Sequence, residues 1–121
     1  MTEMRIITAH GIDGDLGDMN MRVSAHGPYG PGGAQAEYAI GEGVDQGVSR
    51  WLAHLRFQVG NPAEGVNGVT LEALLAVCLD RLSCFQSGPH ANAYNAESLA
   101  HIEKALEALK DRTRERDSHV D

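Results

Sequence analysis

Arg112 and Arg116, near the C-terminus, have the side chains and the spacing best suited to ligand chemistry in this chain. They are four residues apart, so on a helix they project from one face, one turn apart. A guanidinium group donates two parallel hydrogen bonds in a geometry that matches a phosphate group. The pair therefore fits a clamp for a phosphorylated ligand. It fits equally well a set of cations that stabilises the last turns of a helix through the helix dipole.

Other reactive residue types form no recognisable catalytic or metal pattern. The six histidines never pair at a metal-binding spacing such as HxxxH. Asp13, Asp15 and Asp18 lie in a Gly-rich stretch, but the glutamate that ends an EF-hand loop is missing, so a plain turn is favoured there. We find no Ser-His-Asp or Cys-His arrangement. The sequence therefore predicts a protein that is not an enzyme and holds no metal or cofactor.

Length and charge narrow the class of protein. The chain has 121 residues and a formal net charge of -7, which predicts one domain over residues 1–121 and argues against a nucleic-acid polymer as partner. No apolar run reaches the roughly 20 residues that span a membrane, and no signal peptide is expected. Cys78 and Cys84 would face different directions on a helix, which predicts free, buried thiols typical of a cytoplasmic protein.

The first half of the chain, residues 1–60, predicts a small antiparallel β-sheet. Strands are expected at residues 5–8, 19–26, 36–40 and 51–58, where apolar and polar side chains alternate most clearly in the second and fourth. The segments GPYGPGGA and GEGVDQG between them are expected to be loops or turns, because glycine and proline interrupt strands. Strict alternation in the last strand would place Trp51 and His54 on opposite faces.

The second half, residues 69–117, predicts an antiparallel helical hairpin, so the fold class is α+β. Thr70 is a candidate N-cap of the first helix, Gly88 and Pro89 end it, and Asn92 is a candidate cap of the second helix, which should run to about Asp117. The second helix carries a coiled-coil-like seam suited to a partner helix or a second subunit, formed by Leu99, Ile102, Leu106 and Leu109.

Two residues at the turn of this hairpin have simple structural interpretations. Phe85 ends the apolar pattern of the first helix, which predicts a core anchor, and Asn95 can help to cap the second helix. Seventeen residues separate Asn95 from Arg112, or about 25 Å of helix. The turn end and the arginine end cannot line one small pocket within one chain. If they share a ligand, the site must combine two subunits.

The stretch from Phe57 to Arg116 resembles a family of phage-encoded sponges, the anti-Thoeris and anti-CBASS proteins that share one hairpin domain. The resemblance lies in GVNGVTLEALLA, DRLSCFQSGP and the Arg112-Thr113 pair, and the N-terminal sheet is similar to the β-region of the anti-Thoeris members. It implies a cytoplasmic protein of the infected bacterium that binds cyclic nucleotide immune signals without cleaving them. The implied ligands are glycocyclic ADP-ribose isomers, and in some members cyclic di- or trinucleotides at a separate site.

The resemblance also implies roles for individual residues. Phe85 would stack on an adenine, Asn95 would hydrogen-bond nearby, and Arg112 and Arg116 would bind the pyrophosphate, between subunits of a homo-oligomer of up to six copies. The segment HANAYN at residues 90–95 lacks an arginine of the family pattern, which implies a weaker second site. The alternative function is a structural or protein-interaction subunit whose hairpin only drives oligomerisation.

Overall fold

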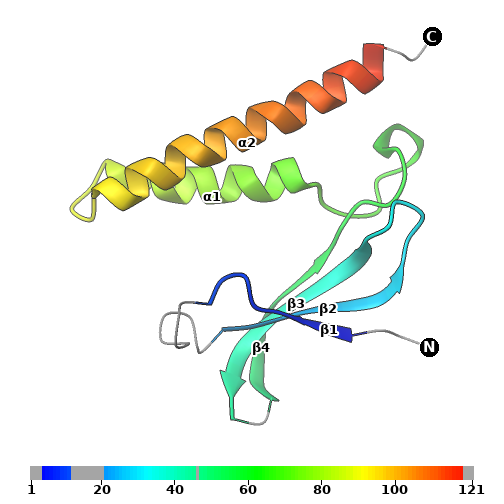
Figure 1. The fold of residues 1–121 in the computed structure, drawn as a ribbon, viewed down its shortest axis with the longest axis horizontal. Coiled ribbons are helices and arrows are strands. Elements are labelled where there is room, and N and C mark those ends of the chain that lie inside the picture. The colour runs from blue at the N-terminus through cyan, green and yellow to red at the C-terminus, as the bar shows by residue number, and fades with distance from the viewer. Residues whose placement is uncertain (1–3, 12–20, 46, 119–121) are drawn as a thin grey trace. The chain divides into compact units, whose positions relative to one another are not determined.

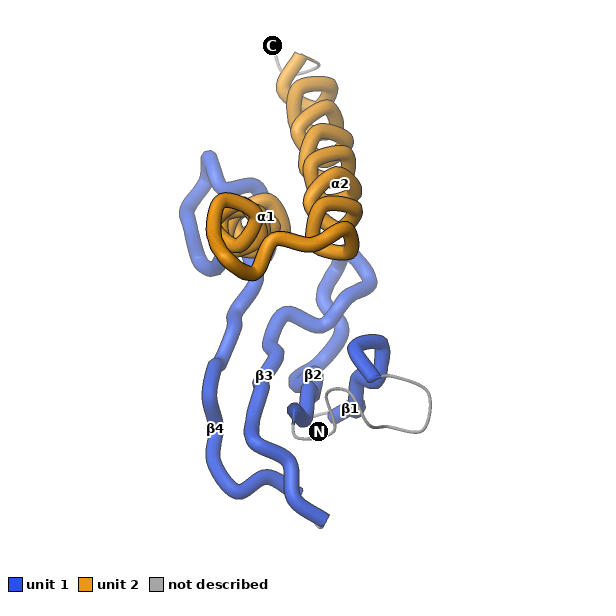
Figure 2. Tube along the Cα trace, turned by 90° about the vertical axis from the view of Figure 1, so that its left-hand side faces the viewer, with its two compact units in different colours: residues 1–69 blue, residues 70–121 orange. Residues whose placement is uncertain are grey.

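The computed structural model describes residues 4–11, 21–45 and 47–118 (Figure 1). The chain divides into two compact units, residues 1–69 and residues 70–121 (Figure 2). The first unit contains the sheet and the second contains the helices. Residues 12–20, which contain Asp13, Asp15 and Asp18 of the predicted turn and the start of the second predicted strand, lie outside the described residues.

The first unit is a four-stranded antiparallel sheet, which confirms the predicted antiparallel sheet, and its strand order is β1-β2-β3-β4. Its strands are β1 (Met4–Ile7), β2 (Met21–Tyr29), β3 (Gln35–Val44) and β4 (Gly47–Arg56). Each strand pairs with the next one along the chain, so every connection that the structure describes is of the hairpin type. Together with the two helices of the second unit, this sheet confirms the predicted α+β class.

Two predicted loops are shorter than expected, and this part of the prediction was wrong. Strand β2 continues through Gly27 and Pro28 to Tyr29, and β3 continues to Val44. The proline is accommodated because the pairing of β2 with β3 is irregular between His26 and Tyr29, where a missing ladder hydrogen bond costs little. Gly27 adopts a φ of 88°, which a residue with a side chain rarely does.

Strand β4 contains a bulge that the alternation pattern did not reveal. Ala53 of β4 pairs with Ile40 of β3, and Trp51 of β4 pairs with the next residue, Gly41. Leu52 of β4 is therefore left unpaired. Residues directly opposite one another share a face of an antiparallel sheet, so Trp51 joins the face that also carries His54. The prediction that these two side chains lie on opposite faces was wrong.

The connection at residues 57–69 is held by its own side chains. The Gln58 side chain donates to the Gly65 carbonyl (2.9 Å) and accepts from the Asn67 amide (2.9 Å), while the Asn67 side chain accepts from the Val59 amide (2.8 Å). A 3-10 turn, η1 (Pro62–Glu64), lies within this connection. Gly68 has no space for a Cβ, because the backbone of Phe57 lies against it.

The second unit is an antiparallel hairpin of α1 (Leu71–Gln86) and α2 (Ala93–Ser118), as predicted. Both predicted caps are confirmed: the Thr70 hydroxyl accepts from the Ala73 amide (3.1 Å), and the Asn92 side chain accepts from the Asn95 amide (2.8 Å). The predicted seam of α2 is also confirmed, because its four apolar residues are less exposed than their neighbours and Leu106 is buried.

The buried apolar core of the described residues is small. It consists of Ala25, Ala39 and Leu106, and none of the larger described side chains is fully buried. Exposed large apolar side chains occur in both units, Trp51 and Val77 among them. Cys78 and Cys84 are free but exposed, so the prediction of buried thiols was wrong. Neither α1 nor α2 has an apolar stretch of the length that a membrane-spanning helix needs, which holds for all described residues.

Candidate functional site

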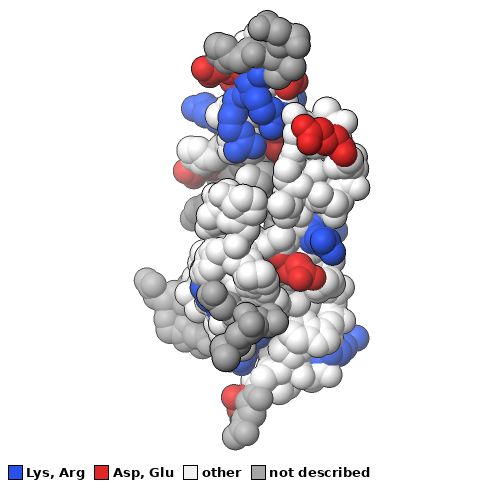
Figure 3. Space-filling model, turned by 90° about the vertical axis from the view of Figure 1, so that its right-hand side faces the viewer, with Lys and Arg blue, Asp and Glu red and all other residues white. Residues whose placement is uncertain are grey.

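The C-terminal turns of α2 carry a group of arginines (Figure 3). Arg112 and Arg116 lie one turn apart with side chains that are 61% and 50% exposed. Their nearest carboxylate oxygens are 3.9 Å away on Glu72 and 3.6 Å away on Asp117. Both distances are longer than a hydrogen bond, so these ion pairs are loose and the guanidinium groups can exchange them for a phosphate.

Arg114, between these two arginines, is held differently. Its guanidinium donates to Asp111 (2.6 Å) and to Glu107 (2.9 Å), on the side of α2 away from Arg112 and Arg116. The hydrogen bond to Glu107, followed by the bond to Asp111, raises the pKa of Arg114 above its ordinary value. Arg114 is therefore paired within its own helix, which distinguishes it from the two arginines that the sequence singles out.

Glu72, which sequence reasoning did not select, contacts Arg112 and Thr113 at the arginine end of the hairpin. It lies in the first turn of α1 and accepts a hydrogen bond from the Thr113 hydroxyl (3.3 Å) in addition to its ion pair with Arg112. This contact joins residues 41 positions apart, so no local pattern could have revealed it. The first turn of α1 thus lies beside the arginine pair and adds one negative charge to it.

The turn end of the hairpin contains an aromatic ring with polar neighbours. Phe85 is half-buried, with the Arg81 guanidinium 5.2 Å from its ring centroid and the His90 ring edge-on at 6.5 Å. Arg81 precedes Phe85 by one helical turn, a spacing that could have identified this cation–π contact in advance. Asn95 is half-buried in the first turn of α2, where its backbone amide donates a hydrogen bond to the side chain of the cap residue Asn92.

The four predicted site residues thus form two separate pairs. Phe85 and Asn95 lie at the turn end of the hairpin, and Arg112 and Arg116 lie at the opposite end of α2. Because α2 is one continuous helix, Asn95 and Arg112 are about 25 Å apart along its axis. One chain does not bring the two pairs together.

Histidine, cysteine and acidic side chains do not gather into a metal site in the part of the chain that the structure describes: no three of them lie close enough to hold an ion. The predicted turn with Asp13, Asp15 and Asp18 lies outside that part. The two ends of the hairpin therefore offer a ligand charge, hydrogen bonding and an aromatic surface.

Comparison with known proteins identifies the hairpin. A family model described as the Acb2/Tad1 hairpin domain matches residues 52–114, from β4 to the C-terminal part of α2, including Phe85, Asn95 and Arg112 but not Arg116. The chain is also 34% identical over 90 residues to Thoeris anti-defense 1 of Bacillus phage SBSphiJ7. That match covers 74% of this chain and 60% of the relative, so the chain spans less than two thirds of the relative's length. The chain belongs to the Acb2/Tad1 hairpin-domain family.

Proposed function

We propose that this protein counters the Thoeris defence of bacteria by binding a cyclic nucleotide signal and holding it without cleavage. The ligand class is the glycocyclic ADP-ribose isomers, with cyclic di- or trinucleotides as further ligands. The proposal draws on the family membership, on the name of the phage relative and on the sponge resemblance of the hairpin motifs. It places the protein in the cytoplasm of the infected cell, where such signals are made.

The observation that carries the proposal is the state of Arg112 and Arg116. Two exposed guanidinium groups on one helix face, each with a loose carboxylate partner among the described residues, can bind the two phosphates of a pyrophosphate with charge-assisted hydrogen bonds. Each such bond contributes about 1.5–3 kcal/mol. Binding then needs no turnover, and slow release of the ligand is sufficient for sequestration.

The other half of the site would come from the turn end. The Phe85 ring can stack on an adenine, an interaction worth ~1–3 kcal/mol per base, and the Asn95 side chain can hydrogen-bond near the base. The separation of the two ends along α2 supports a composite site, in which Phe85 and Asn95 of one copy meet Arg112 and Arg116 of another. The small core and the exposed apolar side chains support such assembly.

The same exposed apolar surface favours a second candidate, a structural subunit whose hairpin only drives oligomerisation. The two candidates differ in what happens to a ligand. A structural subunit leaves a cyclic nucleotide free in solution, a sponge depletes it, and an enzyme converts it.

The test is to incubate the protein with glycocyclic ADP-ribose, remove the protein by filtration, and measure free ligand before and after heat denaturation. We expect depletion by the folded protein and recovery of intact ligand after heating. Recovery of cleavage products would show an enzyme, and an unchanged free concentration would favour the structural subunit.

Two variants test the site residues in the same assay. We expect Arg112→Ala and Asn95→Ala each to abolish depletion, because each removes contacts from one half of the site, while the oligomer measured by light scattering stays assembled. Lys110→Ala is a matched control that removes a cation from the same end of α2, where Lys110 only pairs loosely with Glu107 (4.0 Å). Unchanged depletion by both site variants would contradict the assignment.

A further inference from the structure

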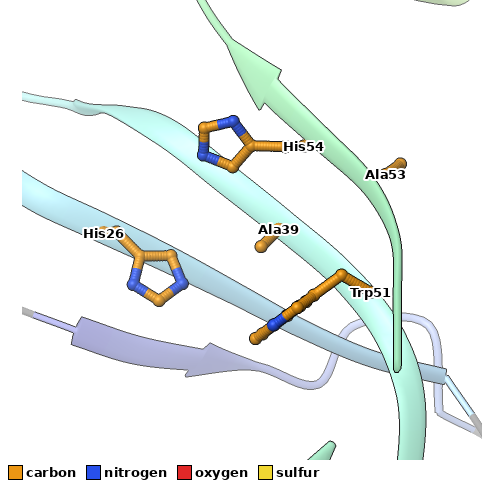
Figure 4. Close-up of a pocket in the computed structure, with 5 residues that line it drawn as sticks. All are labelled: His26, Ala39, Trp51, Ala53 and His54. Carbon is orange, nitrogen blue, oxygen red and sulfur yellow. The ribbon is translucent and has the colours of Figure 1, made fainter. Parts of the chain in front are cut away.

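The sheet carries a hollow that the hairpin site does not use. On one face of β3 the small Ala39 lies between Ser24 of β2 and His54 of β4, its direct cross-strand neighbours. The hollow has a volume of about 380 Å³ and is lined by His26, Ala39, Trp51, Ala53 and His54 (Figure 4). This volume lies at the small end of the range of ligand-binding pockets.

The bulge in β4 creates this hollow. By leaving Leu52 unpaired it turns Trp51 onto the face of His54, with Trp51 opposite Gly41. Gly41 must lack a side chain, because a Cβ there would meet the Trp51 ring at 3.0 Å and the Val48 side chain at 2.5 Å. Adjacent strands lie ~4.8 Å apart, so the walls on β2 and β4 stand about 10 Å apart across the Ala39 floor, enough for a flat ring.

The walls of the hollow combine an aromatic surface with polar edges (Figure 4). Trp51 is 58% exposed, so much of its indole is open to a ligand. The His26 ring is anchored by a 2.7 Å hydrogen bond to the buried Ser24 hydroxyl, and the His54 ring lies 3.8 Å from the Glu37 carboxylate. The two imidazoles are thus oriented from outside the hollow and border it with groups that can donate or accept hydrogen bonds.

The charge of the lining residues restricts the class of ligand that the hollow can bind. None of the five lining residues is a lysine or an arginine, so the hollow offers no fixed positive charge to a phosphate. An indole face and two imidazole edges suit a flat, uncharged heteroaromatic ring, which stacks on the indole and hydrogen-bonds at its rim. We propose that His26, Trp51 and His54 form a second ligand site on the sheet, which binds a planar nucleobase-like ring and is separate from the arginine pair.

Trp51 is the single tryptophan of the chain, so its fluorescence reports on this site alone. Adenosine, an uncharged nucleoside, is the probe: titrated into the full-length protein, it should quench the Trp51 emission in a saturable way. Because no phosphate contact is involved, the affinity should change little with added salt, unlike that of a site built on arginines.

Variants complete the test. His26→Ala and His54→Ala, which retain the tryptophan, should each weaken adenosine binding by roughly tenfold through the loss of a hydrogen bond at the rim. His101→Ala is the matched control, since it removes an exposed histidine from α2 and should leave the titration unchanged. Absence of saturable quenching, or equal weakening by all three variants, would overturn the proposal. An emission maximum that shifts with protein concentration but not with adenosine would also overturn it, and would indicate that a second copy covers Trp51.

Discussion

At the scale of single residues, the three arginines of the last turns of α2 differ because of their neighbours rather than their type. Arg114 is bound to Glu107 and Asp111 by short hydrogen bonds, whereas the carboxylate partners of Arg112 and Arg116 in the described part of the chain lie 3.9 Å and 3.6 Å away. The same hydrogen bonds raise the pKa of Arg114 above its ordinary value. Two guanidinium groups, those of Arg112 and Arg116, can therefore bind an anion, whereas that of Arg114 is paired with carboxylates of its own helix.

Glu72 provides a prediction at this scale. Its carboxylate is 3.9 Å from Arg112 and competes with any anion that approaches the arginine. Two unit charges at about 4 Å attract by ~1 kcal/mol in water, so Glu72→Gln should tighten the binding of glycocyclic ADP-ribose by roughly two- to fivefold. Isothermal titration calorimetry at low salt measures this change.

Glu97→Gln is the matched control for this substitution. It makes the same charge change in the first turns of α2, where Glu97 lies near His101 rather than near the arginines, and it should leave the affinity unchanged. Weaker binding by Glu72→Gln would show instead that the carboxylate orients Arg112 for the ligand through its contacts with Arg112 and Thr113.

At the scale of elements, the hairpin depends on one seam. The apolar residues of α2 recur at spacings of three and four, and Leu106 in their middle is the buried member. Asn95 before the seam and Thr113 after it are both half-buried, so they extend its packing surface towards the two ends of the hairpin. Packing along this surface therefore positions Asn95, whereas the side chains of Arg112 and Arg116 stay exposed.

We expect Leu106→Ala to lower the free energy of unfolding by about 2–4 kcal/mol, because a buried leucine loses its transfer free energy and leaves a cavity. Val77→Ala on α1 is the control, since Val77 is 60% exposed and its truncation should change the free energy of unfolding little. Chemical denaturation followed by circular dichroism at the helix signal measures both. An equal loss of stability in the two variants would show that Val77 is covered by another surface, such as a second copy.

At the scale of the whole molecule, few apolar side chains of the described residues are buried. The sheet and the hairpin form two compact units, each with exposed large apolar side chains. Chains of this kind gain stability when a second copy covers such surface. That residues 1–121 behave as a single domain stays a prediction, as does assembly into a homo-oligomer of up to six copies.

Complementation between variants tests the composite site at this scale. Arg112→Ala damages one half of the proposed site and Asn95→Ala damages the other, so neither chain alone should deplete glycocyclic ADP-ribose. When the two chains are unfolded and refolded together, roughly a quarter of the sites should be intact, because each site draws its halves from two copies. Depletion should therefore return in the mixture. A mixture that assembles but stays inactive would show that each site is built within one chain.

Local sequence signals determined most of the hairpin. The caps at Thr70 and Asn92, the stop at Gly88 and Pro89, and the seam through Leu106 were all predictable, because each depends on residues no more than a few turns apart. The order of a sheet followed by two helices was predictable for the same reason. The ligand roles of Phe85, Asn95, Arg112 and Arg116 stay predictions that rest on the resemblance.

Contacts between distant segments decided the rest. The approach of Glu72 to Arg112 and Thr113, the lengths of β2 and β3, and the shared face of Trp51 and His54 arise from pairing across strands and helices. A bulge of one residue reverses the face of every side chain on one side of it, and no alternation pattern records where it occurs. The arginine pair could therefore be recognised from the sequence alone, whereas the hollow around Ala39 exists only in the folded sheet.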